Sequence, residues 1–373
     1  LKAISSETVN KTYKDIDVDI SHFRSLLNEK GIKKGDFVGI YSPNSYDFVK
    51  GFLSVTTLGG VAVLIPPQLP LEVVNLLTMK YSMKGLLFNS CFEEKFNQFN
   101  PLNKDTKVIN LNESSLNLLN VNKVNGKDPC CILFTGGTTG KSKGALLNNK
   151  AILTGAINGF YGYQNVFNQR YLLVLPLTHV FGLVRNLMTS LCTGSDFFIV
   201  SNNKDMFKNI AMHRPTIMVM VPALAEMALN LSKQFNKNML GDDLKVIICG
   251  ATQVPPFLIQ EYMKIGIQML PGYGLTESAN LVTGNPEIVK KPDSVGLPYE
   301  GQILRIVNGE LQIKGANIMD SYYNDEEIAK ELDLLPLTMV ILIVPFLISK
   351  KEEIFDVALA ARTAVLQGYL RFR

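Results

Sequence analysis

The chain has 373 residues, of which 47% are hydrophobic and 19% are charged, and its formal net charge is +4. This length and composition are typical of a globular protein with a substantial core, and they exclude a disordered or fibrous chain and a minimal binding module. The 37 basic and 33 acidic residues are scattered, so we expect neither a nucleic-acid partner nor a polybasic anchor.

The cysteines and histidines follow no metal-ligand spacing. The five cysteines are Cys91, Cys130, Cys131, Cys192 and Cys249. Their odd number and mostly apolar surroundings predict buried, reduced thiols in a cytoplasmic protein, and we expect no structural metal. The first ten residues lack the regions of a secretory signal. The chain also begins without Met, which suggests a fragment.

Strands and helices alternate along the first 250 residues. Residues 13–30 are predicted to form a helix that ends before Gly31, and residues 36–41 a short buried strand. A helix over 45–58 and a strand over 61–65 follow. Further strands are predicted at 86–88, 107–109, 131–134, 171–175, 197–200, 217–221 and 246–249. Parallel strands joined by helices predict an α/β fold with both sheet faces covered.

After Gly274 the pattern changes to short segments with close turns. Residues 303–307 and 310–314 flank an Asn-Gly pair and are predicted to form a hairpin. The expected organisation is α/β subdomains over 1–275, a smaller β-rich subdomain over 276–330 and a diverged tail over 331–373. Within that tail, the apolar run 334–348 contains two prolines and is shorter than the roughly 20 residues of a membrane-spanning helix, so no integral membrane segment is predicted.

The most informative segment is FTGGTTGKSKGA, residues 134–145, directly after a predicted strand. Its glycines let backbone amides approach an anion, its hydroxyls add donors and its two lysines add charge, which favours phosphate binding over a solvated turn. A Walker A loop is the alternative, because residues 140–142 match its last triplet. However, Thr135 stands where that motif requires glycine, and Gly144 interrupts the helix that should begin at Lys141.

The segment resembles the signature loop of the adenylate-forming superfamily, which includes acyl-CoA synthetases, coumarate-CoA ligases, luciferases and adenylation domains. Ser142 stands where the usual family form has proline. Three further segments resemble family motifs in the expected order: LPLTHVFGL at 175–183, CGAT at 249–252 and GYGLTES at 272–278. The resemblance covers roughly residues 10–330.

The resemblance implies roles for individual residues. His179 would border the acyl pocket, and the catalytic set would be Lys143, His179, Thr276 and Glu277. The nucleotide-binding set would be Thr135, Gly136, Gly137, Thr138, Thr139, Gly140, Lys143, Gly250, Ala251, Thr252, Gly272, Tyr273, Gly274 and Thr276. Taken singly, His179 would more often be a structural histidine, and Tyr273 a packing residue.

The implied chemistry suits these side chains. Tyr273 offers an aromatic face to adenine, and Thr276 a hydroxyl to the α-phosphate. Glu277 offers an oxygen ligand to Mg²⁺, which would neutralise charge as a carboxylate oxygen attacks the α-phosphorus.

The implied fold is the large, multi-layer α/β/α N-terminal domain of adenylate-forming enzymes with a smaller β-rich subdomain. The implied activity is ATP-dependent activation of a carboxylic acid, most like a fatty acid, followed by transfer to coenzyme A. Other aryl or amino acids remain alternative substrates.

After Tyr323 the family's aspartate-bearing segment, arginine-bearing hinge and lysine-bearing mobile domain are not recognisable. An adenylate-binding protein without turnover is therefore an alternative, as is a P-loop nucleotidase.

Overall fold

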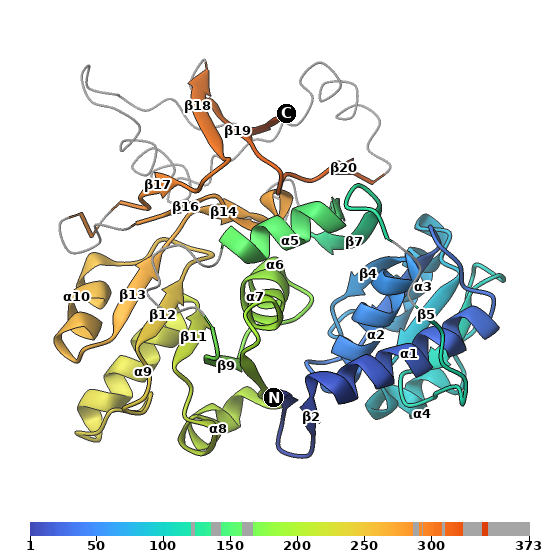
Figure 1. Cartoon of the computed structure of the whole chain (residues 1–373), viewed down its shortest axis with the longest axis horizontal. Coiled ribbons are helices and arrows are strands. Elements are labelled where there is room, and N and C mark those ends of the chain that lie inside the picture. Colours follow the sequence, from blue (N-terminus) through green and yellow to red (C-terminus); the bar gives the residue numbers. More distant parts are fainter. Residues whose placement is uncertain are drawn as a thin grey trace.

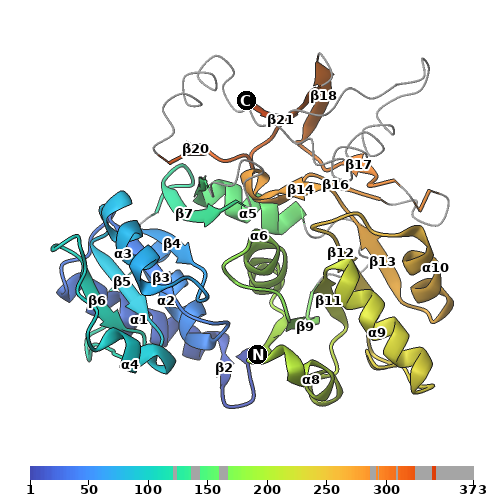
Figure 2. The same cartoon turned by 180° about the vertical axis from the view of Figure 1, so that it is seen from behind.

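Two seven-stranded sheets organise the chain, and smaller antiparallel sheets lie beside them (Figure 1). The computed structural model describes residues 1–120, 124–135, 143–158, 167–285, 291–292, 294–307, 310–323 and 338–341. We call the sheet with strand order β20-β8-β7-β4-β3-β5-β6 sheet I, and the sheet with order β13-β12-β11-β9-β10-β1-β2 sheet II. The N-terminus lies between the two halves of the molecule, as the view from behind also shows (Figure 2).

Sheet I takes six of its seven strands from the first 150 residues, and β20 joins it from much later in the chain. Its strands are β3 (Phe37–Tyr41), β4 (Val61–Ile65), β5 (Gly85–Phe88), β6 (Lys107–Asn110), β7 (Pro129–Phe134), β8 (Gly144–Asn148) and β20 (Ser321–Tyr322). The helices that connect or flank them are α1 (Tyr13–Glu29), α2 (Tyr46–Leu58), α3 (Leu71–Lys80), α4 (Glu93–Phe96) and α5 (Asn149–Ile157). All five residues of β4 are buried, as expected for a central parallel strand.

Local sequence signals explain where helix α2 begins and ends. Ser45 caps its first turn by accepting a hydrogen bond from the Phe48 amide at 3.1 Å. Gly59 ends it with φ +88°, a left-handed conformation that glycine adopts without steric cost. Helices α1 and α2 pack on each other, and their buried faces belong to the main hydrophobic core.

Sheet II carries most of the remaining α/β structure. Its strands are β1 (Lys2–Ser5), β2 (Asn10–Thr12), β9 (Arg170–Leu173), β10 (Asp196–Ile199), β11 (Ile217–Met220), β12 (Val246–Cys249) and β13 (Gln268–Pro271). Its helical segments are α6 (Val180–Gly182), the π-helix η3 (Leu183–Met188), α7 (Thr189–Cys192), α8 (Met206–His213), α9 (Pro222–Gln234) and α10 (Pro256–Lys264). Strands β9 to β13 pair in parallel, so their carboxyl ends share one edge.

Short antiparallel strands follow sheet II. They are β14 (Gly274–Leu275), β15 (Asn280–Leu281), β16 (Thr283–Gly284), β17 (Leu297–Pro298), β18 (Ile303–Val307), β19 (Glu310–Lys314) and β21 (Thr338–Ile341). The predicted hairpin is confirmed, because Val307 pairs with Glu310. Residues 308–309 of its predicted turn lie outside the described residues. Most of the predicted tail also lies outside them.

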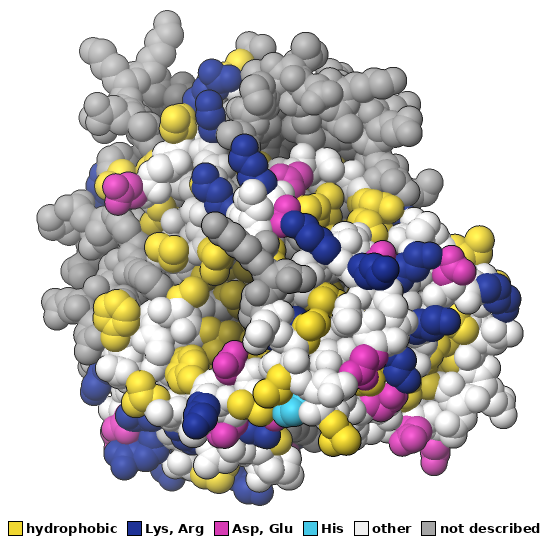
Figure 3. All heavy atoms as spheres, turned by 45° about the vertical axis from the view of Figure 1, so that its right-hand side comes forward, with side chains coloured by type: hydrophobic (Ala, Val, Ile, Leu, Met, Phe, Trp, Pro, Cys, Tyr) yellow, Lys and Arg dark blue, Asp and Glu magenta, His cyan; other side chains and the backbone are white. Residues whose placement is uncertain are grey.

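The predicted α/β class is confirmed, but two expectations need correction. The sequence analysis predicted no strand between 134 and 171 and only parallel pairing, yet residues 144–148 form strand β8, which pairs with β7 in antiparallel orientation. All five cysteines are free, yet Cys91 and Cys192 are exposed, because both lie on surface helical turns that leave the thiol near solvent. On the face drawn in Figure 3, side chains of both charges occur side by side. Within the described ranges, no helix has the length and apolar content needed to cross a membrane.

Candidate nucleotide and acid site

Lys143 lies at the base of the hairpin formed by β7 and β8. Its carbonyl accepts a hydrogen bond from the Thr135 amide at 2.9 Å, and the next residue, Gly144, pairs with Phe134. The hairpin therefore brings the two ends of the predicted phosphate loop together. Gly136, Gly137, Thr138, Thr139 and Gly140 lie outside the described residues.

The same hairpin decides against the P-loop alternative. A Walker A loop continues into a helix from its lysine, which would include Gly144. Here Gly144 is the first residue of a strand that pairs with β7. The residues that follow the loop therefore form a strand and not the helix that a P-loop nucleotidase requires.

Two of the predicted motifs meet at the carboxyl edge of sheet II. Cys249 pairs with Pro271 on the neighbouring parallel strand, so the turns that begin at Gly250 and Gly272 are adjacent. A Cβ atom added to Gly250 would lie 3.7 Å from the Gly272 carbonyl oxygen. Ala251 has φ +68°, a left-handed conformation that residues with a Cβ rarely adopt. Such local strain is often found at functional sites. Ala251 is also exposed, next to the turn that begins at Gly272.

The segment after Gly272 folds back on itself. Strand β14 pairs with β15, and the one-turn helix η5 (Thr276–Ser278) connects them. A Cβ atom at Gly274 would fall 2.1 Å from the Asn280 carbonyl oxygen, so only glycine fits there. Tyr273 and Thr276 are half-buried at the start of this fold-back. Burial, followed by the nearby charge of Glu277, raises the pKa of Tyr273.

Glu277 is a carboxylate held inside the protein. Its side chain is 3% exposed, and it accepts a hydrogen bond from the Tyr322 hydroxyl on Oε1. Its backbone carbonyl accepts from the Met319 amide at 2.7 Å. Burial raises the pKa of Glu277, while the Tyr322 hydroxyl and the charge of Lys143 oppose that shift. A carboxylate in this position is a ready oxygen ligand for a cation that would lower its cost of burial.

Tyr322 brings the first and last motifs together. It lies on β20, where it pairs with Ala145 of β8. The Nζ atom of Lys143 is 5.1 Å from the centroid of the Tyr322 ring, and the hydroxyl of the same ring contacts Glu277. Lys143 and Glu277 are therefore on the same side of the molecule and close enough to affect each other electrostatically. The sequence did not predict a role for Tyr322, because nothing in its local pattern shows that a two-residue strand returns to sheet I.

His179 forms one wall beside these turns. Its side chain is exposed, and its Nδ1 accepts a hydrogen bond from the Phe181 amide at 3.2 Å, which caps helix α6. Surrounding protein atoms lower the pKa of His179 by desolvation. The Phe181 ring lies 3.3 Å from where a Cβ of Gly250 would be, so this segment packs against the turn that begins at Gly250. His213, by contrast, is a structural histidine whose Nε2 contacts the Tyr171 carbonyl at 3.1 Å.

Asn44 is a further residue that sequence reasoning missed. From the end of β3 in sheet I, its amide donates to the Leu175 carbonyl at 2.9 Å and accepts from the Leu177 amide at 2.9 Å. It thereby fixes the segment that leads to His179. Next to this contact lies a cleft of about 380 Å³. Its described lining carries no charged side chain and consists of Ser42, Pro43, Asn44, Pro67, Gln68, Val174, Pro176, Thr178, Val200, Ser201, Asn202 and Asn203.

The donor set suits a magnesium ion that is bound together with a nucleotide. The described residues contain no cluster of three or more histidine, cysteine, aspartate or glutamate side chains that could hold a metal by themselves. Mg²⁺ commonly takes one or two carboxylates and completes its shell with phosphate oxygens and water. Glu277 beside Lys143 fits that pattern, because the phosphates would supply the other ligands.

Comparison with known proteins agrees with this arrangement. A family model described as "AMP-binding enzyme" matches residues 2–323. An indoleacetate–CoA ligase of Aromatoleum aromaticum is 31% identical over 220 residues, which cover 54% of this chain and 42% of that protein. A 2-succinylbenzoate–CoA ligase of Oceanobacillus iheyensis is 24% identical over 89% of this chain and 71% of its own length.

The fold also matches a solved structure. The N-terminal domain of the Mycobacterium tuberculosis protein FACL13 superposes with a TM-score of 0.81 at 24% identity, covering 92% of this chain and 93% of that domain. The arrangement of two sheets and antiparallel strands is therefore found in both proteins. With the family model spanning most of the chain, the protein belongs to the AMP-binding enzyme family.

Proposed function

We propose that this chain binds ATP with Mg²⁺ and activates a carboxylic acid as its acyl-adenylate, whose acyl group is then transferred to coenzyme A with release of AMP. The observation that carries the proposal is the contact of Tyr322 with both Lys143 and Glu277. This contact joins the phosphate-loop hairpin to the turns at the edge of sheet II. If one nucleotide has its phosphates at the hairpin and its base at the turns, these two parts of the protein must lie next to each other.

The first half-reaction needs charge neutralisation more than covalent chemistry. The acid's carboxylate oxygen attacks the α-phosphorus, a new P–O bond forms, and the bond to pyrophosphate breaks. Lys143 supplies a positive charge, and Thr276 supplies a hydroxyl donor at the α-phosphate. Glu277 would hold the magnesium ion, which supplies Lewis-acid stabilisation of the phosphate oxygens when bound. Gly250, which is buried, and the exposed Ala251 and Thr252 would lie along the adenine.

The second half-reaction needs access for a thiol. Its sulfur attacks the acyl carbonyl, and AMP leaves with the electrons of the broken C–O bond. The uncharged cleft beside Asn44 and Thr178 has a suitable volume and polarity for the amide- and hydroxyl-bearing arm of coenzyme A. Along the chain, His179 lies between Thr178, which lines this cleft, and Phe181, whose ring is next to Gly250, and it would border the acyl group.

The acid itself is identified only by class. The relatives above are named for indoleacetate and 2-succinylbenzoate, whereas the sequence motifs predicted a fatty acid. The alignments with these ligases span between 42% and 71% of their lengths. We therefore propose adenylation of a carboxylic acid as the first activity of this chain, and transfer of the acyl group to coenzyme A as the step that follows it.

The test is ATP–pyrophosphate exchange against a panel of aliphatic, aryl and dicarboxylic acids, with AMP binding measured separately by calorimetry. Exchange that depends on one acid class supports adenylation and names the substrate. AMP binding without exchange for any acid would instead make the chain an adenylate-binding protein. Absence of any AMP or ATP binding would refute the proposed site altogether.

A further inference from the structure

A cluster of four aromatic rings lies next to the base of the hairpin that carries Lys143. Tyr81 is fully buried at the carboxyl end of α3, and its ring centroid lies 4.8 Å from that of Tyr323 and 6.1 Å from that of Phe134. Phe37, the first residue of β3, completes the cluster at 5.0 Å from Tyr323. Packed aromatic pairs of this kind add stability beyond the area that they bury, so the rings hold one another in place.

Three members of the aromatic cluster contact Gly144, the residue that follows Lys143. The Tyr323 amide donates a hydrogen bond to the Gly144 carbonyl at 2.9 Å. Phe134 pairs with Gly144 across the hairpin. A Cβ atom at Gly144 would lie 2.5 Å from the Tyr81 hydroxyl oxygen, so the tyrosine already fills the space beside this glycine. The aromatic cluster therefore fixes the backbone at residue 144.

Tyr81 is held by the packing of its ring. Its hydroxyl is buried and has no hydrogen-bond partner within the part of the chain that the structure describes. Burial, followed by the nearby Tyr323, raises the pKa of Tyr81 to about 12, so the hydroxyl is uncharged near pH 7. A buried hydroxyl without a partner costs folding free energy, of about 1–3 kcal/mol. The ring, and not a hydrogen bond, is therefore what Tyr81 contributes to the hairpin.

The effect of the aromatic cluster reaches the side chain of Lys143 through two consecutive tyrosines. Tyr323 packs on Tyr81, whereas the Tyr322 ring centroid lies 5.1 Å from the Nζ atom of Lys143. Lys143 precedes Gly144 directly. A shift of the backbone at Gly144 would therefore move the ammonium group relative to the Tyr322 ring.

We propose that Tyr81 is a positioning residue: its ring, packed within the aromatic cluster, sets the place of Lys143 and thereby the affinity of the site for the phosphate chain of ATP. This inference rests on the proposed function, because it concerns the phosphate-binding part of that same site. A fixed cation attracts ATP more strongly than AMP, since ATP carries more negative charge. A correctly placed Lys143 should therefore favour ATP over AMP.

The test is calorimetry of ATP with Mg²⁺, and of AMP, binding to the full chain, which gives the ratio of the two affinities. We expect Tyr81→Leu to lower the preference for ATP about tenfold, the size of one charge-assisted contact, and to change AMP affinity by less than about twofold. Tyr81→Phe keeps the ring and should keep the preference. A purely structural role would reduce the amount of folded protein without changing this ratio.

Two further variants test the specificity of the effect. Phe96→Leu is the matched control, because Phe96 is also buried against sheet I but stacks on Phe88 of β5 at 4.4 Å. Strands β4 and β3 lie between β5 and the hairpin strand β7, so this variant should keep the preference. Lys143→Met tests the route. In that background Tyr81→Leu should cause no further loss of preference, because both changes act through the same cation.

The outcomes separate the inference from the proposed function. An unchanged preference in Tyr81→Leu would overturn the inference, as would an equal loss in Phe96→Leu or a full further loss in the Lys143→Met background. An unmodified chain that binds AMP without preferring ATP would also refute the inference and leave the adenylate site standing. A chain that binds neither nucleotide would refute the proposed function as well.

A second pair of variants decides if Tyr81→Leu does not fold. Gly144→Ala should lose the preference for ATP, because its Cβ would lie 2.5 Å from the Tyr81 hydroxyl and displace the hairpin base. Adding Tyr81→Phe removes that oxygen and should restore part of the preference. The recovery should be partial, because the added Cβ would also lie 2.8 Å from Ile132. No recovery would overturn the inference.

Discussion

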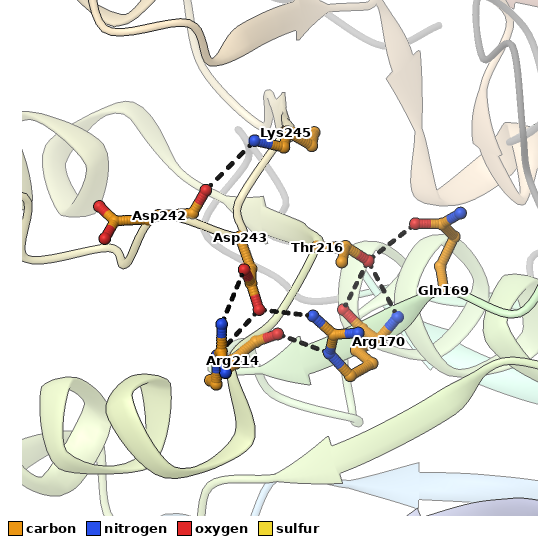
Figure 4. A network of polar contacts seen from close by, with 7 residues as sticks. All are labelled: Gln169, Arg170, Arg214, Thr216, Asp242, Asp243 and Lys245. Atoms are coloured by element: carbon orange, nitrogen blue, oxygen red, sulfur yellow. Dashed lines mark hydrogen bonds and ion pairs between the residues drawn. The ribbon is translucent and has the colours of Figure 1, made fainter.

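The two ends of sheet II use polar residues in opposite ways. At the amino ends of β9, β11 and β12, polar side chains bond to one another (Figure 4). Asp243 pairs with Arg170 at 2.8 Å and with Arg214 at 2.9 Å. Thr216 donates to Gln169 at 2.8 Å and accepts from the Arg170 amide at 3.0 Å. These groups satisfy each other near solvent, so their role is to hold strand ends in register.

The carboxyl ends, by contrast, lie close to a strained backbone conformation and to buried ionisable side chains. Ala251 has a left-handed backbone, Glu277 is a buried carboxyl with a raised pKa, and Arg185 is a buried cation. Each feature costs folding free energy that the amino-end network does not. Costly arrangements persist where binding a ligand requires them, which supports the proposal of a site at the carboxyl ends.

The largest effect is expected for Glu277→Gln in pyrophosphate exchange. The amide can still accept the Tyr322 hydroxyl, but it loses the charge that would hold magnesium. We expect exchange to fall about 10²- to 10³-fold, as for removal of one strong electrostatic contact in other enzymes. Unchanged exchange across a magnesium titration would show that Glu277 is not a metal ligand.

Gly274→Ala should cause the next largest effect, on stability. The added Cβ would collide with the Asn280 carbonyl at 2.1 Å, and backbone atoms cannot give way cheaply. We expect a loss of about 3 kcal/mol in the free energy of unfolding, measured with urea. Gly266→Ala is the control, because Gly266 has φ +79° but open space around it. Its left-handed backbone alone should cost about 1 kcal/mol, and similar losses for both variants would contradict the steric argument.

Glu277→Gln should affect stability in the direction opposite to its effect on activity. Burial raises the pKa of Glu277 above its ordinary value of 4.5, so folding favours the protonated carboxyl. The stability from this group is complete below pH 4.5 and is lost as the pH rises through the folded-state pKa. Without ligand, the variant should therefore melt higher than the unmodified chain at pH 7, with a difference that shrinks toward pH 4.5. A difference that grows in acid would contradict the raised pKa.

Asp243→Asn should give the smallest effect. Its ion pairs with Arg170 and Arg214 are partly exposed, and such pairs are worth about 0.2–1 kcal/mol each. We expect a small loss of melting temperature that disappears at high salt, because salt already screens the pairs. AMP affinity should not change. A large loss of AMP affinity would mean that the two ends of sheet II are coupled.

Most of the fold followed from local patterns. The helix predicted over 13–30 corresponds to α1, and the strand predicted over 61–65 coincides with β4. These segments are bounded by glycine or proline and have clear apolar spacing, so their limits were visible in the sequence. Strand β8 was not predicted at all, because its five residues follow the glycine-rich loop directly and include only a short apolar run, and its antiparallel pairing was missed with it.

The candidate site was predicted only as a set of separated motifs. The structure places Lys143, Gly250, Gly272 and Glu277 on one side of the molecule, but their roles stay predictions. Asn44 and Tyr322 were missed for a shared physical reason: each acts through a contact with residues more than 40 positions away. Such contacts depend on how sheets I and II pack, and no local pattern encodes that packing.

Through the position of Tyr322, a force on the backbone near residue 323 would be transmitted to Glu277. Its hydroxyl touches Glu277 on one side, and its strand anchors it to β8 on the other. The next residue, Tyr323, packs on Phe37 and Tyr81, which are part of sheet I and its covering layer. A pull on the backbone beyond this tyrosine pair would thus be resisted first by the aromatic anchor. Once the anchor yields, the same pull would withdraw the hydroxyl from the carboxylate, so tension in the chain would act on Glu277.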